Sequence, residues 1–281
     1  MIVDFHVHIF PESVCRDREC RFPGESAFEQ LYASPRAKLA TAEELIAAMD
    51  AEGVDRSVVF GFPWASAGAF RPHNDYIMEA VARHPDRLTG FCCFDATHPA
   101  AAAEAERCLD AGLAGVGELA FYDSGLDTAV LDRLAPVLAV CRERDCPVLI
   151  HTNEPVGHPY PGKAPIRLGE IYAMAKRFPE NRFVLAHWGG GLFFYHLMKK
   201  ETKDVLANVW YDTAASPYLY RPQVWTVAVA AAGAERILFG SDYPLLPPSR
   251  YFRDMAEGGI DASDRARITG GNAAGLLGLR P

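Results

Sequence analysis

Two spacings of apolar residues alternate along the chain. Short, mostly apolar runs have the pattern of buried strands, and longer segments with apolar residues three or four apart have the pattern of amphipathic helices. Strands are predicted at residues 3–10, 57–62, 87–94, 114–120, 147–151, 182–187, 207–213 and 236–241. Helices are predicted between them; one follows the capping-box pattern of Thr41 and Glu44 and ends at Gly53. Short apolar strands that alternate with helices are typical of a parallel α/β sheet.

A single (β/α)8 barrel, the TIM-barrel fold of the α/β class, explains this pattern better than an open doubly wound sheet. Eight regular repeats fill the usual barrel length of about 250 residues. No Gly-x-Gly-x-x-Gly sequence follows the first strand, as a dinucleotide-binding open sheet would require. We therefore expect one domain over residues 1–281. It would carry a lid-like insertion at 11–40 after the first strand, a mouth loop at 153–165 and a C-terminal helix at 273–279.

Composition limits the partners. The 281 residues are 49% apolar and 23% charged, with a net charge of −8 and no cluster of Lys or Arg, so neither nucleic acid nor a membrane surface is an expected partner. No apolar run is long enough for a transmembrane helix, and the N-terminus lacks the pattern of a signal peptide. Seven cysteines, an odd number, favour reduced thiols. The prediction is a cytoplasmic protein that acts on a small molecule.

His6 and His8 provide the first chemical signal. Alternation along a strand places both imidazoles on one face, where they could bind one divalent metal side by side. Taken alone, such a pair is more often two hydrogen-bonded polar residues without a metal.

Further polar residues stand where other predicted strands end. They are Glu118 near the end of the fourth strand, His151 at the end of the fifth, His187 at the end of the sixth and Asp242 directly after the eighth. In a (β/α)8 barrel the ends of the strands meet at one mouth, which holds the active site. Histidines with a carboxylate match the ligands of a hydrolytic zinc site with an open position for water. The sequence therefore predicts a metal site at the mouth.

These motifs resemble the amidohydrolase superfamily over nearly the whole chain. The similar segments are His6-Val-His8, Leu-Ile-His151-Thr, Leu-Ala-His187-Trp-Gly-Gly and Phe-Gly-Ser-Asp242-Tyr-Pro. The segment 268–274, Ile-Thr-Gly-Gly-Asn-Ala-Ala, is similar to the branch that includes aminocarboxymuconate-semialdehyde decarboxylase. The motifs are specific for the superfamily and do not name a substrate.

The resemblance implies one divalent metal, with zinc expected, held by His6, His8, His151 and Asp242. It assigns catalytic roles to Asp242, which would move the proton of an activated water, and to His187, which would help the metal to stabilise an oxyanion. It also suggests a homodimer.

Glu118 leaves an alternative open. The chain has no lysine at the position that many binuclear relatives carboxylate, and Glu118 stands there instead. It would either bind a second metal or orient a neighbouring ligand, and we favour the orienting role.

Six further residues are candidates for substrate binding, each of which also fits a solvated or packed side chain. They are Glu154, Lys163, Tyr218, Arg221, Trp64 and Trp188. Lys163, Arg221 or Tyr218 could hold a substrate carboxylate, and the two tryptophans could form an apolar wall.

Three functions are compatible with these predictions. The leading one is a zinc-dependent hydrolase that uses a metal-activated water on an amide, lactone or ester-like bond of a small molecule. The alternative is a non-hydrolytic metal-dependent decarboxylase or hydratase of a small unsaturated acid. A non-catalytic binding barrel is the least favoured, because all expected ligands are present.

Overall fold

The computed structural model describes residues 1–279 and contains an eight-stranded sheet in which each strand pairs in parallel with the next. The strands are β1 (Val3–His8), β2 (Arg56–Phe60), β3 (Leu88–Cys92), β4 (Gly115–Leu119), β5 (Pro147–Ile150), β6 (Arg182–Leu185), β7 (Val209–Asp212) and β8 (Ile237–Leu238). The sheet closes on itself, because the backbone N–H of Phe5 donates to the carbonyl of Phe239 at 2.7 Å and that of His8 to Tyr243 at 2.9 Å. The predicted (β/α)8 barrel is confirmed. The last two residues of the predicted 1–281 domain lie outside the described residues.

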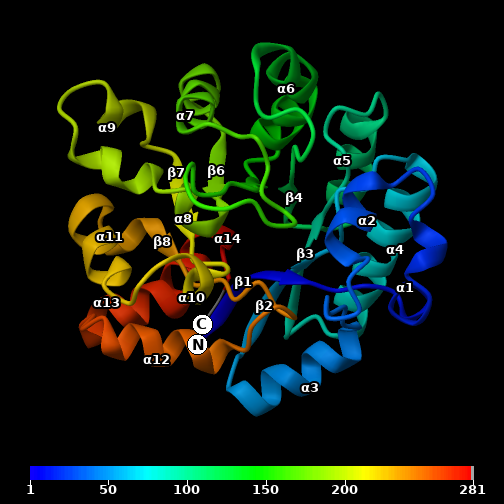
Figure 1. Cartoon of the computed structure of the whole chain (residues 1–281), viewed down its shortest axis with the longest axis horizontal. Helices are drawn as coiled ribbons and strands as arrows, with labels where there is room; N and C mark the ends of the chain where they lie inside the picture. The colour runs from blue at the N-terminus through cyan, green and yellow to red at the C-terminus, as the bar shows by residue number, and fades with distance from the viewer. Residues whose placement is uncertain (280–281) are drawn as a thin grey trace.

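Helices surround the strands (Figure 1). The longer ones are α3 (Ala42–Glu52), α4 (Ala67–Arg83), α5 (Ala101–Asp110), α6 (Thr128–Glu143), α7 (Leu168–Arg177), α11 (Val224–Ala232) and α12 (Pro248–Glu257). The shorter ones are α8 (Ala186–Gly189), η2 (Leu192–Leu197), α9 (Thr202–Val205), α10 (Ser216–Leu219), η3 (Ala234–Arg236), α13 (Ala262–Ala266), η4 (Arg267–Gly271) and α14 (Asn272–Leu277). The capping box of Thr41 and Glu44 is present, and Gly53 ends α3 in the left-handed conformation. Within residues 1–279, no helix combines the length and apolarity needed to cross a membrane.

Apolar side chains form two separate cores. One consists of strand residues such as Phe5, Phe60 and Leu149, with Leu276 of α14 packed against them, and fills the barrel interior. The other lies between the outer faces of the strands and the helices. This two-core arrangement explains why the strands are apolar on both faces.

All eight strands end one to three residues earlier than predicted, and two of these ends have a clear cause or bear on the site. β8 ends at Leu238, because the next two backbone N–H groups donate elsewhere: Phe239 to the carbonyl of Ile268 at 2.9 Å and Gly240 to the hydroxyl of Thr213 at 3.0 Å. β6 ends at Leu185, so His187 lies in the short turn α8 with a φ of 56°.

The insertion at residues 11–40 is partly helical and is fixed to the barrel. It contains α1 (Glu12–Arg16), η1 (Glu19–Arg21) and α2 (Ser26–Tyr32), which lie on the same side of the molecule as α4 (Figure 1). The buried carboxylate of Glu25 accepts hydrogen bonds from the Ala65 backbone at 2.7 Å and from the Ser66 hydroxyl at 2.8 Å. Phe28 packs on Trp64 with ring centroids 4.4 Å apart. Its role as a lid stays a prediction.

Candidate metal centre

His6 and His8 face the barrel interior. Their neighbours Val7 and Ile9 belong to the outer core, whereas both imidazoles pack on Phe60 of the inner core, so the two rings point inward, with centroids 5.3 Å apart. The register of β1 shifts between Asp4 and Val7, so the inner-core residue Phe5 and its neighbour His6 both face the interior. His6 Nδ1 donates to the carboxylate of Asp212 at 2.8 Å, and His8 Nδ1 donates to the carbonyl of Gly61 at 2.9 Å. The Nε2 atoms are therefore free of a proton in the neutral rings and available to a metal.

Glu118 and Asp242 face these two nitrogens. His6 Nε2 lies 3.6 Å from an oxygen of each carboxylate, and His8 Nε2 lies 3.5 Å from Glu118 and 3.6 Å from Asp242. These separations are too long for good hydrogen bonds. Two ligands that bind one zinc at about 2.1 Å with a tetrahedral angle lie about 3.4 Å apart. The four groups are therefore spaced as ligands of one ion.

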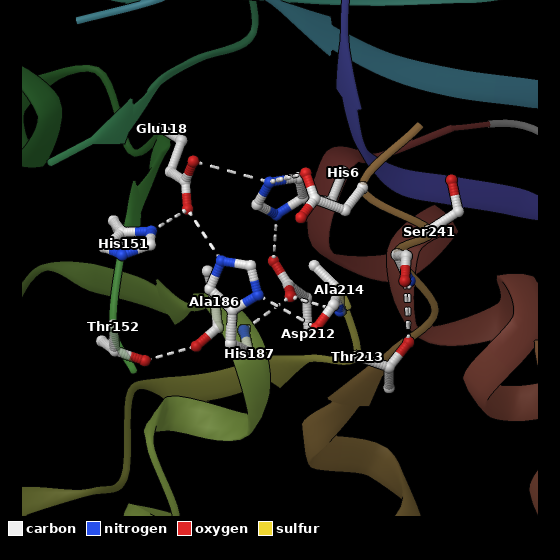
Figure 2. A network of polar contacts seen from close by, with 12 residues as sticks. His6, Glu118, His151, Thr152, Ala186, His187, Asp212, Thr213, Ala214 and Ser241 are labelled. Atoms are coloured by element: carbon white, nitrogen blue, oxygen red, sulfur yellow. Dashed lines mark hydrogen bonds and ion pairs between the residues drawn. The ribbon is translucent and has the colours of Figure 1, made fainter. Parts of the chain in front are cut away.

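Glu118 also contacts the other two histidines of the cluster (Figure 2). Its second oxygen lies 3.0 Å from His151 Nδ1 and 3.5 Å from His187 Nε2. His151 Nε2 donates to the carbonyl of Gly162 at 2.9 Å, which leaves Nδ1 without a proton in the neutral ring. Both the unprotonated Nδ1 of His151 and the carboxylate oxygen of Glu118 are hydrogen-bond acceptors, so a proton or a metal cation must lie between them.

The charges of the cluster shift its pKa values strongly. Burial alone would raise the pKa of Glu118, but the charges of His6 and His151 hold it well below its usual value. Burial alone would lower the pKa of His6, but the charges of Asp212 and Glu118 hold it well above its usual value. With neutral imidazoles, three carboxylates would leave a buried excess of negative charge, which a divalent cation compensates.

An unpartnered atom supports the same conclusion. His6 Nε2 is buried and has no hydrogen-bond partner among residues 1–279. Three overlapping groups have ligand atoms within 4.8 Å of one another: His6, His8 and Glu118; His6, His187 and Asp242; Glu118, His151 and His187. The residues present thus fit a divalent metal, and their nitrogen and carboxylate donors suit zinc or manganese.

Asp212, which was not among the predicted site residues, fixes two of them. It is fully buried, and its Oδ1 accepts from the backbone N–H groups of His187 at 3.1 Å and Ala214 at 3.0 Å, while its Oδ2 accepts from His6 (Figure 2). Asp212 ends β7, so the rule that polar residues at strand ends serve the mouth could have identified it.

Two of the substrate-binding candidates are paired with each other. Lys163 Nζ lies 2.9 Å from Glu154, and the Tyr160 hydroxyl donates to the other oxygen of Glu154 at 2.9 Å. The charge of Lys163 is therefore compensated within the mouth loop, and its contact with a substrate carboxylate stays a prediction.

The other four candidates lie in packing contacts or at the surface. Trp64 and Trp188 are buried, and their indole N–H groups donate to His73 Nδ1 at 2.7 Å and to Ser216 Oγ at 2.8 Å. Tyr218 is 64% exposed, and Arg221 is also exposed. The structure does not use the two tryptophans as the open apolar wall that was expected.

An eight-stranded parallel barrel with this cluster at its mouth defines a metal-dependent barrel enzyme. The amidohydrolase family model matches residues 3–279, and the chain belongs to that family. The gamma-resorcylate decarboxylase of Polaromonas sp. (strain JS666 / ATCC BAA-500) is 25% identical over 250 residues, covering 74% of this chain and 76% of the relative.

Solved structures share the fold. The 5-carboxyvanillate decarboxylase from Sphingomonas paucimobilis superposes with a TM-score of 0.76 at 19% identity and covers 99% of both chains. A second structure is the dihydroxybenzoic acid decarboxylase from Polaromonas sp. JS666, which contains bound manganese and the inhibitor 2-nitroresorcinol. It superposes with a TM-score of 0.71 at 20% identity, and the match covers 100% of this chain and 98% of that decarboxylase.

The prediction of a hydrolase is wrong. The relatives found by sequence include gamma-resorcylate decarboxylases, and decarboxylation breaks a carbon–carbon bond without water. The predicted metal ligands fit both hydrolysis and decarboxylation, so the sequence motifs could not exclude either. The comparisons favour the alternative, a non-hydrolytic decarboxylase.

Proposed function

We propose that this protein is a metal-dependent decarboxylase of a small aromatic acid that carries an oxygen substituent beside its carboxylate. The observation that carries the proposal is the placement of His6 and His8 within 3.6 Å of both Glu118 and Asp242. The likeness to gamma-resorcylate decarboxylases supports the reaction and the substrate class.

The residues that would hold the metal are His6, His8, His151 and Asp242, with Glu118 as a further ligand at the centre of the group. We propose one ion, because His6 or Glu118 takes part in each of the three ligand groups. When bound, a divalent cation supplies a positive charge that withdraws electrons from the oxygens of the acid. Zinc is the expected metal, and the manganese in the Polaromonas structure makes manganese the second candidate.

The reaction breaks the bond between the ring carbon and the carboxylate carbon, releases carbon dioxide and adds a proton to the ring carbon. His187 is one group that can carry this proton. Its Nδ1 donates to the carbonyl of Ala214 at 3.0 Å, so Nε2 is the atom directed at the site. Burial would lower the pKa of His187, but a hydrogen bond and charge from Glu118, then the charge of Asp242, raise it to about 9.

Asp242 is the second proton carrier in the proposal. Its side chain keeps 16% of its surface exposed at the mouth, while the side chain of His6 is fully buried. The Phe60 ring packs on the rings of His6 and His8, with centroid distances of 5.1 and 4.7 Å, and excludes water on the side of the barrel interior. An apolar floor suits a reaction that needs a proton but no attacking water.

The first test measures carbon dioxide and phenol release. The purified chain is loaded with manganese or zinc and supplied with γ-resorcylate, with 5-carboxyvanillate, or with ester and lactone substrates. We expect equal amounts of carbon dioxide and decarboxylated phenol from an aromatic acid, and no product from His8→Ala. Acid release from esters or lactones without carbon dioxide, by the fully loaded protein, would contradict the proposal.

A second test addresses the metal. Elemental analysis is expected to give one metal per wild-type chain and a lower content in Glu118→Gln, since Glu118 contacts the four histidines. The matched control is Glu257→Gln, an exposed position at the end of α12. Two metals per wild-type chain, falling to one in Glu118→Gln, would replace the single-ion site by a bridged pair.

A further inference from the structure

Two tyrosines from separate parts of the chain contact Phe62 near the metal centre. Tyr32 ends α2 in the insertion, and Tyr122 follows β4, four residues after Glu118. Phe62 packs against both rings, with centroids 5.9 Å from Tyr32 and 6.4 Å from Tyr122, and its plane is within 10° of that of Tyr122. The Tyr122 ring also lies 5.2 Å from the ring of His151. Tyr122 thus borders the cluster, and Tyr32 contacts the same Phe62 ring.

Both hydroxyls are available as hydrogen-bond donors. Over residues 1–279, neither phenol oxygen has a hydrogen-bond partner, and both residues keep part of their surface exposed. Burial, followed by the charges of Asp242 and Glu118, raises the pKa of Tyr32. Burial, followed by the charge of Glu118, raises the pKa of Tyr122. Both phenols therefore keep their protons and lie within electrostatic reach of the same carboxylates.

The insertion holds Tyr32 at this place. Nη1 of Arg18 donates to the carbonyl of Tyr32 at 3.4 Å and to that of Ala37 at 2.7 Å, which fixes the end of α2. The neighbouring Leu31 reaches the mouth loop, where its Cδ2 lies 3.8 Å from the place that a Cβ on Gly162 would take. With Glu25 bound to the β2–α4 loop, both ends of α2 are tied down. Tyr32 is thus a fixed part of the mouth.

We propose that Tyr32 and Tyr122 form the subsite that selects the substrate, by donating hydrogen bonds to oxygen substituents on the ring of an aromatic acid that lies against Tyr122. A partly buried phenol without a hydrogen-bond partner contributes most to binding when a ligand oxygen accepts its hydrogen bond. The pair would favour acids with oxygen substituents over the same acids without them. This inference rests on the proposed function for the aromatic acid and adds the residues that recognise it.

The test removes one hydroxyl at a time from the protein and from the ligand. Tyr32→Phe and Tyr122→Phe are compared with the control Tyr172→Phe. Tyr172 lies on α7, and its hydroxyl donates to the exposed carboxylate of Glu201. Calorimetry measures the dissociation constants of 2-nitroresorcinol and nitrobenzene with metal-loaded protein, and kinetics measures kcat and KM for γ-resorcylate. Metal content and the thermal midpoint are recorded for each variant.

We expect each of the two site variants to bind 2-nitroresorcinol about tenfold more weakly, with nitrobenzene binding unchanged. KM should rise by a similar factor while kcat changes less, and Tyr172→Phe should behave as wild type. Unchanged affinity and KM in both site variants, with normal metal content, would overturn the subsite. If 2-nitroresorcinol binds and the variants weaken it, yet no acid is decarboxylated, the subsite stands and the proposed function fails.

Discussion

Replacing Asp212 by Asn changes one atom in the support of the metal centre and tests how the protein fixes the tautomer of His6. In the variant, an amide oxygen could still accept from the backbone N–H groups of His187 and Ala214, which lie 3.1 and 3.0 Å from Oδ1. The amide NH2 would then face His6 Nδ1, 2.8 Å from the replaced oxygen. Because NH2 only donates, Nδ1 must become the acceptor, and the ring proton moves to Nε2.

That shift places a proton on the atom that would bind the metal. Loss of a comparable supporting group costs about 10–100-fold in metal affinity, or about 1.4–2.7 kcal/mol. The fold should persist, since the two backbone hydrogen bonds to Oδ1 remain and only the bond to His6 changes.

Competition with a chromophoric chelator measures the affinity of the variant for manganese and zinc. The control is Asp261→Asn, at the exposed N-cap of α13, where Asn caps a helix as well as Asp. A variant with wild-type metal affinity and unchanged activity would refute the assignment of Asp212 as the group that orients His6.

Three further predictions concern stability. His73 is buried and its pKa is lowered to about 4, mainly by burial, so stability should be fully present above pH 6.5 and be lost as the pH falls from 6.5 to 4, by up to about 3 kcal/mol. Urea denaturation across this pH range should show that the free energy of unfolding falls less steeply with pH in His73→Gln than in the wild type. An equal dependence on pH in the two proteins would contradict the reasoning. A Cβ on Gly240 would lie 2.7 Å from the Cβ of His6, so Gly240→Ala should cost about 1–3 kcal/mol in unfolding free energy and weaken metal binding. Gly275→Ala in α14, where no atom lies within 4 Å, should instead gain about 0.5–1 kcal/mol, and equal effects of the two changes in chemical denaturation would contradict the contact with His6. Removing the metal with a chelator should lower the thermal midpoint, because free metal at a hundred times its dissociation constant stabilises the fold by about 2.7 kcal/mol; an unchanged midpoint would argue against a bound ion.

Much of the fold was predictable from local pattern. Apolar strands and amphipathic helices alternate in the sequence, and Thr41, Glu44 and Gly53 mark the ends of α3 as expected. Element ends were less predictable, because they depend on distant partners. β8 stops at Leu238 since the following N–H groups bond to Ile268 and to the Thr213 hydroxyl, which a local pattern does not contain.

The barrel and the convergence of histidines and carboxylates at its mouth could be predicted from the sequence. The reason is that the period of a strand and the parallel order of strands fix which residues face inward and at which end they meet. The contacts of each side chain could be seen only in the folded structure. It paired Lys163 with Glu154, buried Trp188 and brought Asp212 to His6 across 206 residues. It also placed Tyr32 beside the mouth, because that position depends on how the insertion packs against residues far along the chain.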